Sequence, residues 1–342
     1  MPGIFRTTMM LAGGAAAAIV VNRLRREQNT IDFHDKVAVV TGGSRGLGLG
    51  LAEALARQGA KLAICARDPE QLDVARQHLE SLGAEVLAEP CNVGSQEDVE
   101  QFIGAVRERF GRVDVLINNA GIISVGPVLN QETEDYSRAM DAMFWGVVHP
   151  TLAVLPEMTA RGSGSIANIT SIGGKFPAPH LVPYEAAKFA AVGFSEALTV
   201  DLSGTGVRVT TVVPGLMRTG SYRNALFKGQ HKYEYTWFGL GASLPGFTMS
   251  VPTAVERILT AVRRGDAVAL LDLKTHLATR LHGLMPDSTV TALGLVNRLM
   301  PAPSPDGDRL LPGHQTETPL TQSFLTAMGR EAAERYNQVR ES

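Results

Sequence analysis

Short apolar runs alternate with amphipathic stretches between about residues 32 and 272 of this 342-residue chain. The amphipathic stretches repeat apolar residues every three or four positions, as helices with one buried face do. This alternation predicts an α/β fold with a doubly wound parallel sheet and helices on both faces. We expect seven strands, at residues 36–41, 61–66, 85–91, 113–118, 164–171, 207–213 and 267–271. We expect six helices, at residues 46–58, 69–82, 95–110, 133–161, 183–204 and 251–264.

Two segments interrupt the alternation. Residues 221–250 are rich in aromatic side chains and lie where this fold places a substrate lid, beyond the carboxyl ends of the strands. The aromatics could face a bulky apolar substrate or pack the lid onto its own domain. Two apolar helical pieces follow residue 271, and we expect them to pack on the core, across a dimer or on a membrane surface. The expected organisation is an N-terminal segment (1–30), a catalytic domain (31–275) that includes the lid, and a C-terminal helical extension (276–342).

Composition excludes several classes of protein. Hydrophobic residues make up 44% of the chain and the net charge is −2, which is typical of a globular protein. Basic residues form no patch interleaved with aromatics, so we expect no nucleic-acid partner. The two cysteines, Cys65 and Cys91, end apolar runs and show neither a disulfide framework nor zinc-site spacing, so no metal is expected.

The N-terminus carries an uncharged, mostly apolar run at residues 7–21, followed by arginines at positions 23, 25 and 26. The run is shorter than the roughly 20 residues that span a bilayer. A membrane contact through partial insertion, a signal peptide and a frayed or self-packing tail are the three interpretations. If the run anchors the chain, the arginine excess places the main body in the cytoplasm. We therefore expect a cytoplasmic protein, with or without membrane attachment.

A glycine-rich turn follows the first expected strand directly. Its residues are Thr41, Gly42, Gly43, Ser44, Arg45, Gly46, Leu47 and Gly48. Glycines allow a tight turn and a close approach of the backbone, and free N–H groups at the start of the next helix point at a phosphate. Because the turn lies between an expected strand and an expected helix, it predicts a dinucleotide site.

The end of the second expected strand predicts the type of dinucleotide. An NAD site usually has an acidic residue there to hold the ribose hydroxyls, but this chain has Ala66 followed by Arg67. The guanidinium groups of Arg67 and Arg45 are suited to pairing with a 2′-phosphate. A solvated Arg67 is the alternative, and we expect NADPH to be preferred over NADH.

A group of three residues in the second half of the chain predicts a proton donor. Tyr184 and Lys188 are four residues apart, so they share one face of a helix, and Ser171 lies upstream. The Lys188 ammonium can favour the ionised form of the Tyr184 phenol, whose ordinary pKa is near ~10. Alone, such a pair is common on solvated helix faces.

Taken with the glycine turn, these motifs resemble the short-chain dehydrogenase/reductase family over about residues 32–272. Asn118-Asn119-Ala120-Gly121 ends the fourth expected strand, and Pro214-Gly215 followed by Thr219 ends the sixth. The resemblance implies hydride transfer between a nicotinamide and a carbonyl or alcohol. It implies that Tyr184 is the general acid/base, Ser171 orients the substrate oxygen, and Lys188 binds the nicotinamide ribose and lowers the Tyr184 pKa. The implied cofactor contacts are Gly42, Ser44, Arg45, Gly46, Gly48, Arg67, Asn92, Val93, Asn119, Ala120, Gly121, Tyr184, Lys188, Pro214, Gly215 and Thr219.

One position departs from the family pattern. Met143 stands where many members have an asparagine that holds a water of the proton relay, and a thioether is only a weak acceptor. We favour an active enzyme; the alternative is an NADP-binding regulatory or scaffold protein with impaired catalysis.

We expect a small carbonyl or alcohol substrate that is apolar or bulky, and a homo-oligomer. The signal-peptide interpretation of residues 7–21 fits poorly with an enzyme that needs the intracellular NADPH pool. His180 lies in the loop between Ser171 and Tyr184, where it could face the substrate, but we favour a solvent-exposed loop residue. Glu185 is expected to face away from the site.

Overall fold

The computed structural model describes residues 30–244 and 246–339. The run at residues 7–21, on which the membrane and signal-peptide interpretations rest, lies outside these ranges. None of the helices in the described ranges combines the length and apolarity that a bilayer crossing requires.

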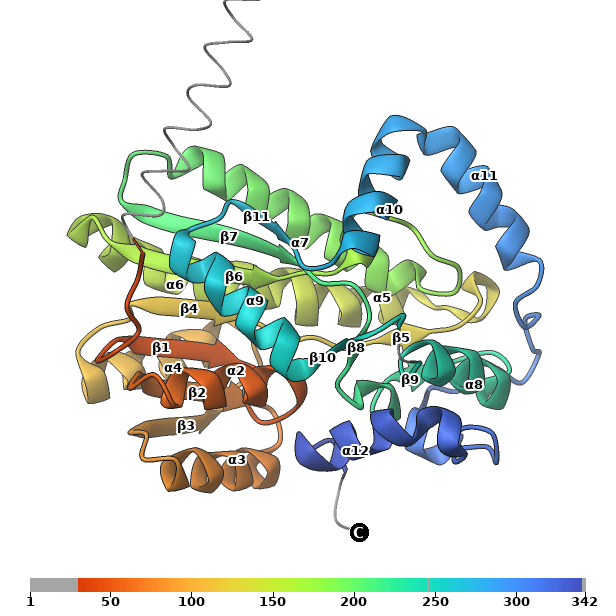
Figure 1. Cartoon of the computed structure of the whole chain (residues 1–342), viewed down its shortest axis with the longest axis horizontal. Coiled ribbons are helices and arrows are strands. Elements are labelled where there is room, and N and C mark those ends of the chain that lie inside the picture. Colours follow the sequence, from red (N-terminus) through yellow and green to blue (C-terminus); the bar gives the residue numbers. More distant parts are fainter. Residues whose placement is uncertain (1–29, 245, 340–342) are drawn as a thin grey trace, which may run out of the picture.

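The centre of the molecule is the predicted seven-stranded sheet, and every strand pair in it is parallel (Figure 1). The spatial order is β11-β7-β6-β4-β1-β2-β3. Each predicted strand forms, within two residues of its predicted bounds. The strands are β1 (Val37–Thr41), β2 (Lys61–Ala66), β3 (Val86–Pro90), β4 (Val115–Asn118), β6 (Gly164–Ile169), β7 (Val207–Val213) and β11 (Val268–Leu270). The order reverses beside β1, so the site of an open α/β sheet is expected at the carboxyl ends of β1 and β4.

Helices cover both faces of the sheet (Figure 1). One face is covered by α2 (Gly46–Ala56), α3 (Pro69–Ser81) and α9 (Val251–Arg264), which share an apolar core with the sheet. The other face is covered by α4 (Gln96–Phe110), α6 (Gly146–Arg161) and α7 (Val182–Asp201). Asp68 and Ser95 accept backbone N–H bonds at the starts of α3 and α4, which fixes where these helices begin.

The helix predicted at residues 133–161 is interrupted. It consists of α5 (Thr133–Met140), a π-helical turn at Asp141–Trp145, and α6. A π turn inserts one extra residue and is often found at functional sites. Here it carries Met143, which is 1% exposed, toward the carboxyl ends of the strands.

The segment predicted as a lid is folded tightly. It contains α8 (His231–Gly241) and two short strands, β9 (Leu226–Phe227) and β10 (Met249–Ser250). These pair with strands from outside the segment in two small sheets: β10 pairs with β8 (Met217–Arg218), and β9 lies between β5 (Ser124–Val125) and β12 (Leu311–Pro312). Tyr222, Phe227, Tyr235 and Phe238 form a buried cluster, while Tyr233 and Phe247 are exposed. Most of the lid aromatics therefore pack the segment onto its own domain.

The C-terminal part makes two different structures. The helices α10 (Leu273–Leu284) and α11 (Pro286–Asn297) form a hairpin at one end of the molecule (Figure 1). Its apolar side chains are largely exposed, with Leu284 at 82% and Leu299, just beyond α11, at 87%, so the hairpin is not packed on the core. The chain then returns past α8 to α12 (Ala327–Arg335). Short 3₁₀ turns lie at Val128–Asn130, Ile172–Gly174, Ser221–Arg223, Gly313–Gln315 and Phe324–Thr326.

Candidate active site

The glycine turn is held in place by side chains from the next strand. The Thr41 hydroxyl accepts the backbone N–H groups of Asn119 and Ala120, at 3.0 and 3.1 Å. The Asn119 amide donates in return to the carbonyls of Thr41 and Gly42, at 3.0 and 3.2 Å. The motifs after β1 and β4 therefore form one structure, and the Asn119 side chain supports the turn.

The turn also requires glycine at defined positions. Gly42 has φ of +65°, and a Cβ there would lie 2.9 Å from the Ala120 α-carbon. A Cβ on Gly48 would lie 2.5 Å from Asn119 Nδ2 and closer still to the Gly42 carbonyl oxygen. Glycine is thus needed here for close backbone approach as well as for conformation.

A cavity of about 670 Å³ opens at the carboxyl ends of the strands, within the usual range for ligand sites. It brings together most of the predicted cofactor and catalytic residues. The predicted residues that line it are Gly42, Ser44, Arg45, Gly46, Gly48, Arg67, Asn92, Val93, Asn119, Ala120, Gly121, Tyr184, Lys188 and Thr219. The predicted residues that do not line it are Ser171, Pro214 and Gly215.

The residues that line the cavity fit a dinucleotide. In the described part of the chain, the N–H groups of Leu47 and Gly48 at the start of α2 have no hydrogen-bond acceptor. Unpaired N–H groups at a helix N-terminus form a ready site for a diphosphate. Arg45 and Arg67 also line the cavity; the Arg45 guanidinium donates to Gln71 Oε1 at 3.4 Å, and Arg67 is exposed.

Ser171, Tyr184 and Lys188 meet beside the ends of β4 and β6. Ser171 begins a 3₁₀ turn after β6, where its hydroxyl accepts the Gly173 N–H at 3.0 Å. A Cβ built on Gly173 would lie 3.2 Å from Tyr184 Cε1 and 3.5 Å from Ser171 Oγ, so the hydroxyl lies near the Tyr184 ring. Tyr184 and Lys188 lie one turn apart on α7, as predicted. The Lys188 ammonium donates to the Ile169 carbonyl at 3.0 Å and lies 6.0 Å from the centre of the Tyr184 ring.

Burial dominates the electrostatics of this group. It raises the pKa of the Tyr184 phenol, although the nearby Ser171 hydroxyl acts on this pKa in the opposite direction. Burial also lowers the pKa of Lys188 to about 8, because the apolar surroundings disfavour its charged form. The net shift of the Tyr184 pKa is thus upward in the chain by itself, and a lowering by Lys188 stays a prediction.

Met143 packs in an apolar cluster with Ala139 and Ala187, and Tyr184 borders this cluster. A Cβ built on Gly121 would lie 3.4 Å from Met143 Cγ, so the thioether fills the space between α7 and the turn after β4. Met143 thus makes an apolar wall beside the phenol.

The structure shows that the prediction of an exposed His180 is wrong and that Glu185 is buried. His180 is buried, and its Nδ1 lies 2.9 Å from both carboxylate oxygens of Glu234, which is 0% exposed. Pairing with a carboxylate on α8 explains why His180 is not an exposed loop residue. Glu185 is buried too, and its carboxylate accepts the Ala178 N–H at 2.7 Å. Burial raises the pKa of Glu185 to about 8.

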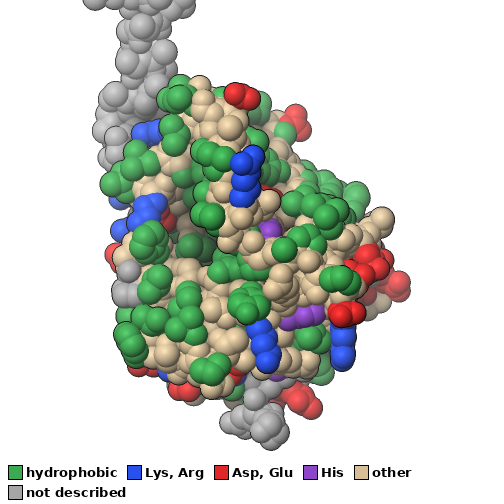
Figure 2. Space-filling view, turned by 90° about the vertical axis from the view of Figure 1, so that its right-hand side faces the viewer, with side chains coloured by type: hydrophobic (Ala, Val, Ile, Leu, Met, Phe, Trp, Pro, Cys, Tyr) green, Lys and Arg blue, Asp and Glu red, His purple; other side chains and the backbone are tan. Residues whose placement is uncertain are grey.

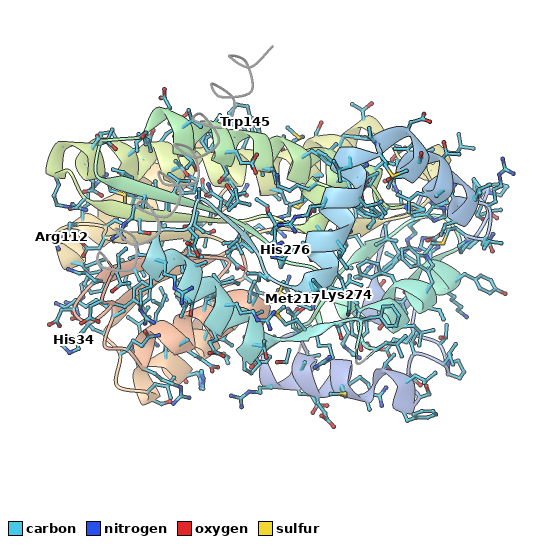
Figure 3. All side chains as sticks on the ribbon, turned by 45° about the horizontal axis from the view of Figure 1, so that its top comes forward. His34, Arg112, Trp145, Met217, Lys274 and His276 are labelled. Atoms are coloured by element: carbon cyan, nitrogen blue, oxygen red, sulfur yellow. The ribbon has the colours of Figure 1, made fainter. Side chains whose placement is uncertain are left out.

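Some lining residues had no signal in the sequence. Met217, Asn224 and Leu226 come from the segment after β7, and Gln338 comes from the end of the described chain. Figure 3 labels Met217 beside the start of α10, which carries Lys274. The predicted lid at residues 221–250 includes Asn224 and Leu226, whereas nothing in the sequence pointed to Met217 or Gln338.

The fold and the site define a class of protein, the nicotinamide-dependent oxidoreductases built on a doubly wound sheet. The family model described as short chain dehydrogenase matches residues 36–227. The chain belongs to the short-chain dehydrogenase/reductase family, and it is an oxidoreductase with a nicotinamide cofactor.

Related proteins agree with this placement. An oxidoreductase named SadH from Mycobacterium tuberculosis is 36% identical over 260 residues, which cover 75% of this chain and 93% of that protein. A crystal structure of actinorhodin polyketide ketoreductase with NADPH is 33% identical with a TM-score of 0.62, covering 69% and 94% of the two chains. A short-chain dehydrogenase/reductase from Burkholderia phymatum in complex with NAD has a TM-score of 0.70 at 24% identity, covering 75% and 96%. That last likeness concerns the fold.

Proposed function

We propose that this protein is an NADP(H)-dependent oxidoreductase that interconverts an apolar or bulky carbonyl compound and its alcohol. The observation that carries the proposal is that Tyr184 and Lys188 line the same cavity as the glycine turn, with Ser171 and Tyr184 both packed against Gly173. Proton donor and cofactor turn thus share one space, as carbonyl reduction requires.

Each of the three residues has a defined task in this proposal. Bound NADPH would supply the hydride. Tyr184 gives a proton to the carbonyl oxygen, and its raised pKa keeps the phenol protonated for this step at neutral pH. Ser171 holds the same oxygen in line. Lys188 binds the nicotinamide ribose, and it carries its charge below a pH of about 8.

The preference for NADPH rests on Arg67 and Arg45, which line the cavity where the acidic residue of an NAD site is missing. The ketoreductase relative in complex with NADPH supports this choice. Arg67→Ala should weaken NADPH binding about tenfold, because a charge-assisted hydrogen bond is lost, and should leave NADH binding nearly unchanged. Arg76→Ala is the control, because that arginine pairs with Asp73 and Glu80 on α3. Equal losses for NADPH and NADH would refute the 2′-phosphate assignment.

The apolar substrate is supported by the cavity lining on the lid side, where Ile122, Ile123, Met217 and Leu226 are found. Ile122 also packs against the apolar cluster of Met143, so this part of the lining offers few hydrogen-bond partners. A panel of ketones with increasing apolar surface, assayed by NADPH absorbance, would test this. Turnover should rise with apolar surface, and a preference for small charged carbonyls would contradict the proposal.

We further propose a homo-oligomer and a cytoplasmic body that contacts a membrane through residues 7–21. Trp145, Leu152 and Phe189 are exposed on the helical layer of α6 and α7, and Figure 3 labels Trp145 on the outer side of that layer. The apolar hairpin α10–α11 faces the viewer in Figure 2, where hydrophobic side chains spread over the upper part of the surface. Large apolar patches mark interaction sites.

These two proposals have separate tests. Sedimentation equilibrium should show an oligomer that dissociates when Trp145 and Phe189 are changed to serine, and a monomeric natural chain would refute it. Full-length chain should sediment with phospholipid vesicles, whereas a chain that starts at Asn29 should bind them less. If both stay in the supernatant, the membrane proposal fails.

We also propose that residues 276–342 form an extension of the catalytic domain at 31–275.

A further inference from the structure

The end of the described chain docks on the glycine turn. The Gly46 N–H donates to the Tyr336 carbonyl at 2.8 Å. The Asn337 amide donates to the carbonyls of Ser44 and Gln71, at 3.0 and 3.2 Å. Tyr336 itself is buried in the core that α2 and α9 share. The contacts join positions about 290 residues apart, and they fix residues 336–338 against the cofactor turn.

Gln338 is the residue of this segment that enters the cavity. Its side chain is 6% exposed and lines the same space as Gly46 and Gly48. The Asn224 amide donates at 2.8 Å both to the Gln338 backbone carbonyl and to Gln338 Oε1. Because Oε1 accepts from Asn224, the other end of the Gln338 amide is the donor Nε2.

The donor end of Gln338 lies over the turn. A Cβ built on Gly46 would be 2.5 Å from Gln338 Nε2, so the amide lies directly against the glycine. Within the described residues, Nε2 has no hydrogen-bond acceptor. The backbone N–H groups of Leu47 and Gly48, one and two residues after Gly46, also lack an acceptor within the described residues. Nε2 is not among the fully buried side-chain atoms that lack a partner, so it faces the open space of the cavity, where a ligand oxygen can accept from it.

We propose that Gln338 is a cofactor-binding residue whose Nε2 donates a hydrogen bond to the diphosphate of the nicotinamide dinucleotide. The proposal rests on the proposed function and adds a residue that lies beyond the family match, which ends at residue 227. Gln338 forms part of the wall of the site, and Asn337 and the Tyr336 carbonyl secure it to the turn. Asn224 is a positioning residue, since it holds the amide of Gln338 in the orientation that presents Nε2.

Binding of NADPH and NADH to the full-length chain, followed by cofactor fluorescence, tests the proposal. Gln338→Ala should weaken both cofactors by about tenfold, because the diphosphate is common to both and a hydrogen bond to a charged group is lost. Gln338→Glu should weaken them further, because a carboxylate of similar length repels the diphosphate. Asn224→Ala should weaken binding less, and the double variant with Gln338→Ala should be no weaker than Gln338→Ala alone.

Gln322→Ala is the matched control, because this exposed amide belongs to the same extension but donates to Glu317 and does not line the cavity. It should bind both cofactors as the natural chain does. Cofactor-free thermal unfolding of Gln338→Ala and Gln338→Glu shows that the losses do not come from unfolding. Binding by Gln338→Ala that equals or exceeds that of the natural chain would overturn the proposal, and tighter binding would show that the segment competes with the cofactor. A natural chain that binds neither cofactor would instead refute the proposed function.

Discussion

A single methyl group added to the glycine turn should weaken cofactor binding strongly. In Gly48→Ala the new Cβ would lie 2.5 Å from Asn119 Nδ2 and closer still to the Gly42 carbonyl oxygen. Real Cβ contacts stay above 3.0 Å, so the turn or Asn119 must move by at least about 0.5 Å. Asn119 cannot withdraw freely, because its amide is bonded to the carbonyls of Thr41 and Gly42.

The size of the effect follows from the number of donors that this movement displaces. Hydrogen bonds to protein groups keep within about 0.5 Å of their preferred length, and the N–H groups of both Leu47 and Gly48 face the cofactor position in our proposal. Losing two bonds to a charged diphosphate, at about 1.5 kcal/mol each, weakens binding about a hundredfold. Overpacking should cost a further 1–3 kcal/mol of folding free energy, roughly.

Gly104→Ala is the matched control. Gly104 lies inside α4, is exposed, and would place its Cβ in open space. Alanine there should raise the free energy of unfolding by about 0.5–1 kcal/mol and leave binding unchanged. Fluorescence titration with NADPH and thermal unfolding of both variants are the assays. NADPH binding by Gly48→Ala at the natural affinity would refute the reasoning that this turn carries the diphosphate.

Three other predictions concern buried groups around the site. The folded chain holds a proton on Glu185 between its ordinary pKa of 4.5 and about 8, so its contribution to stability falls as pH rises through that window, by a few kcal/mol. Denaturant unfolding of Glu185→Gln between pH 5 and 7.5 should therefore show a flatter pH dependence than the natural chain; an unchanged slope would contradict the burial effect. Lys228, which is 2% exposed, pairs with Asp135 at 2.7 Å, so Asp135→Ala should lower the unfolding free energy by about 3 kcal/mol; a loss below 1 kcal/mol would show that Glu132 alone satisfies Lys228. Met143→Asn should raise turnover by restoring a polar group beside Tyr184 while lowering the thermal midpoint, because an amide replaces a packed apolar side chain; lower turnover with NADPH binding intact would show that the proton takes another route.

The sequence predicted the sheet well because its signals are local. Strand β7 and helix α9 form at the predicted bounds, since an apolar run between turn residues needs no distant contact to be recognised. The glycine turn and the Tyr184/Lys188 spacing were equally readable, because each is set within a few residues of chain. Their meeting in one cavity follows from the parallel sheet, whose strand ends share an edge.

Other features depend on distant partners and left no local pattern. His180 is buried only because Glu234, 54 positions away, lies opposite it. The π turn at Asp141–Trp145 interrupts what reads as one continuous helix. The lowered pKa of Lys188 reflects the density of its surroundings, which spacing does not reveal. Gln338 reaches the site through a fold-back of the whole C-terminal extension, and its neighbours in sequence gave no hint of a ligand.

The central claim is that Tyr184 delivers the proton in a hydride-transfer site. The most direct test compares Tyr184→Phe with the natural chain, measuring NADPH oxidation with a panel of apolar ketones and NADPH binding by fluorescence. Removing the phenol oxygen should lower turnover by at least about a hundredfold, the range for a lost general acid, while the affinity for NADPH stays within about twofold. Turnover by Tyr184→Phe at the natural rate would contradict the account. Tight NADPH binding by the natural chain with no turnover on any ketone would instead support a binding or scaffold role.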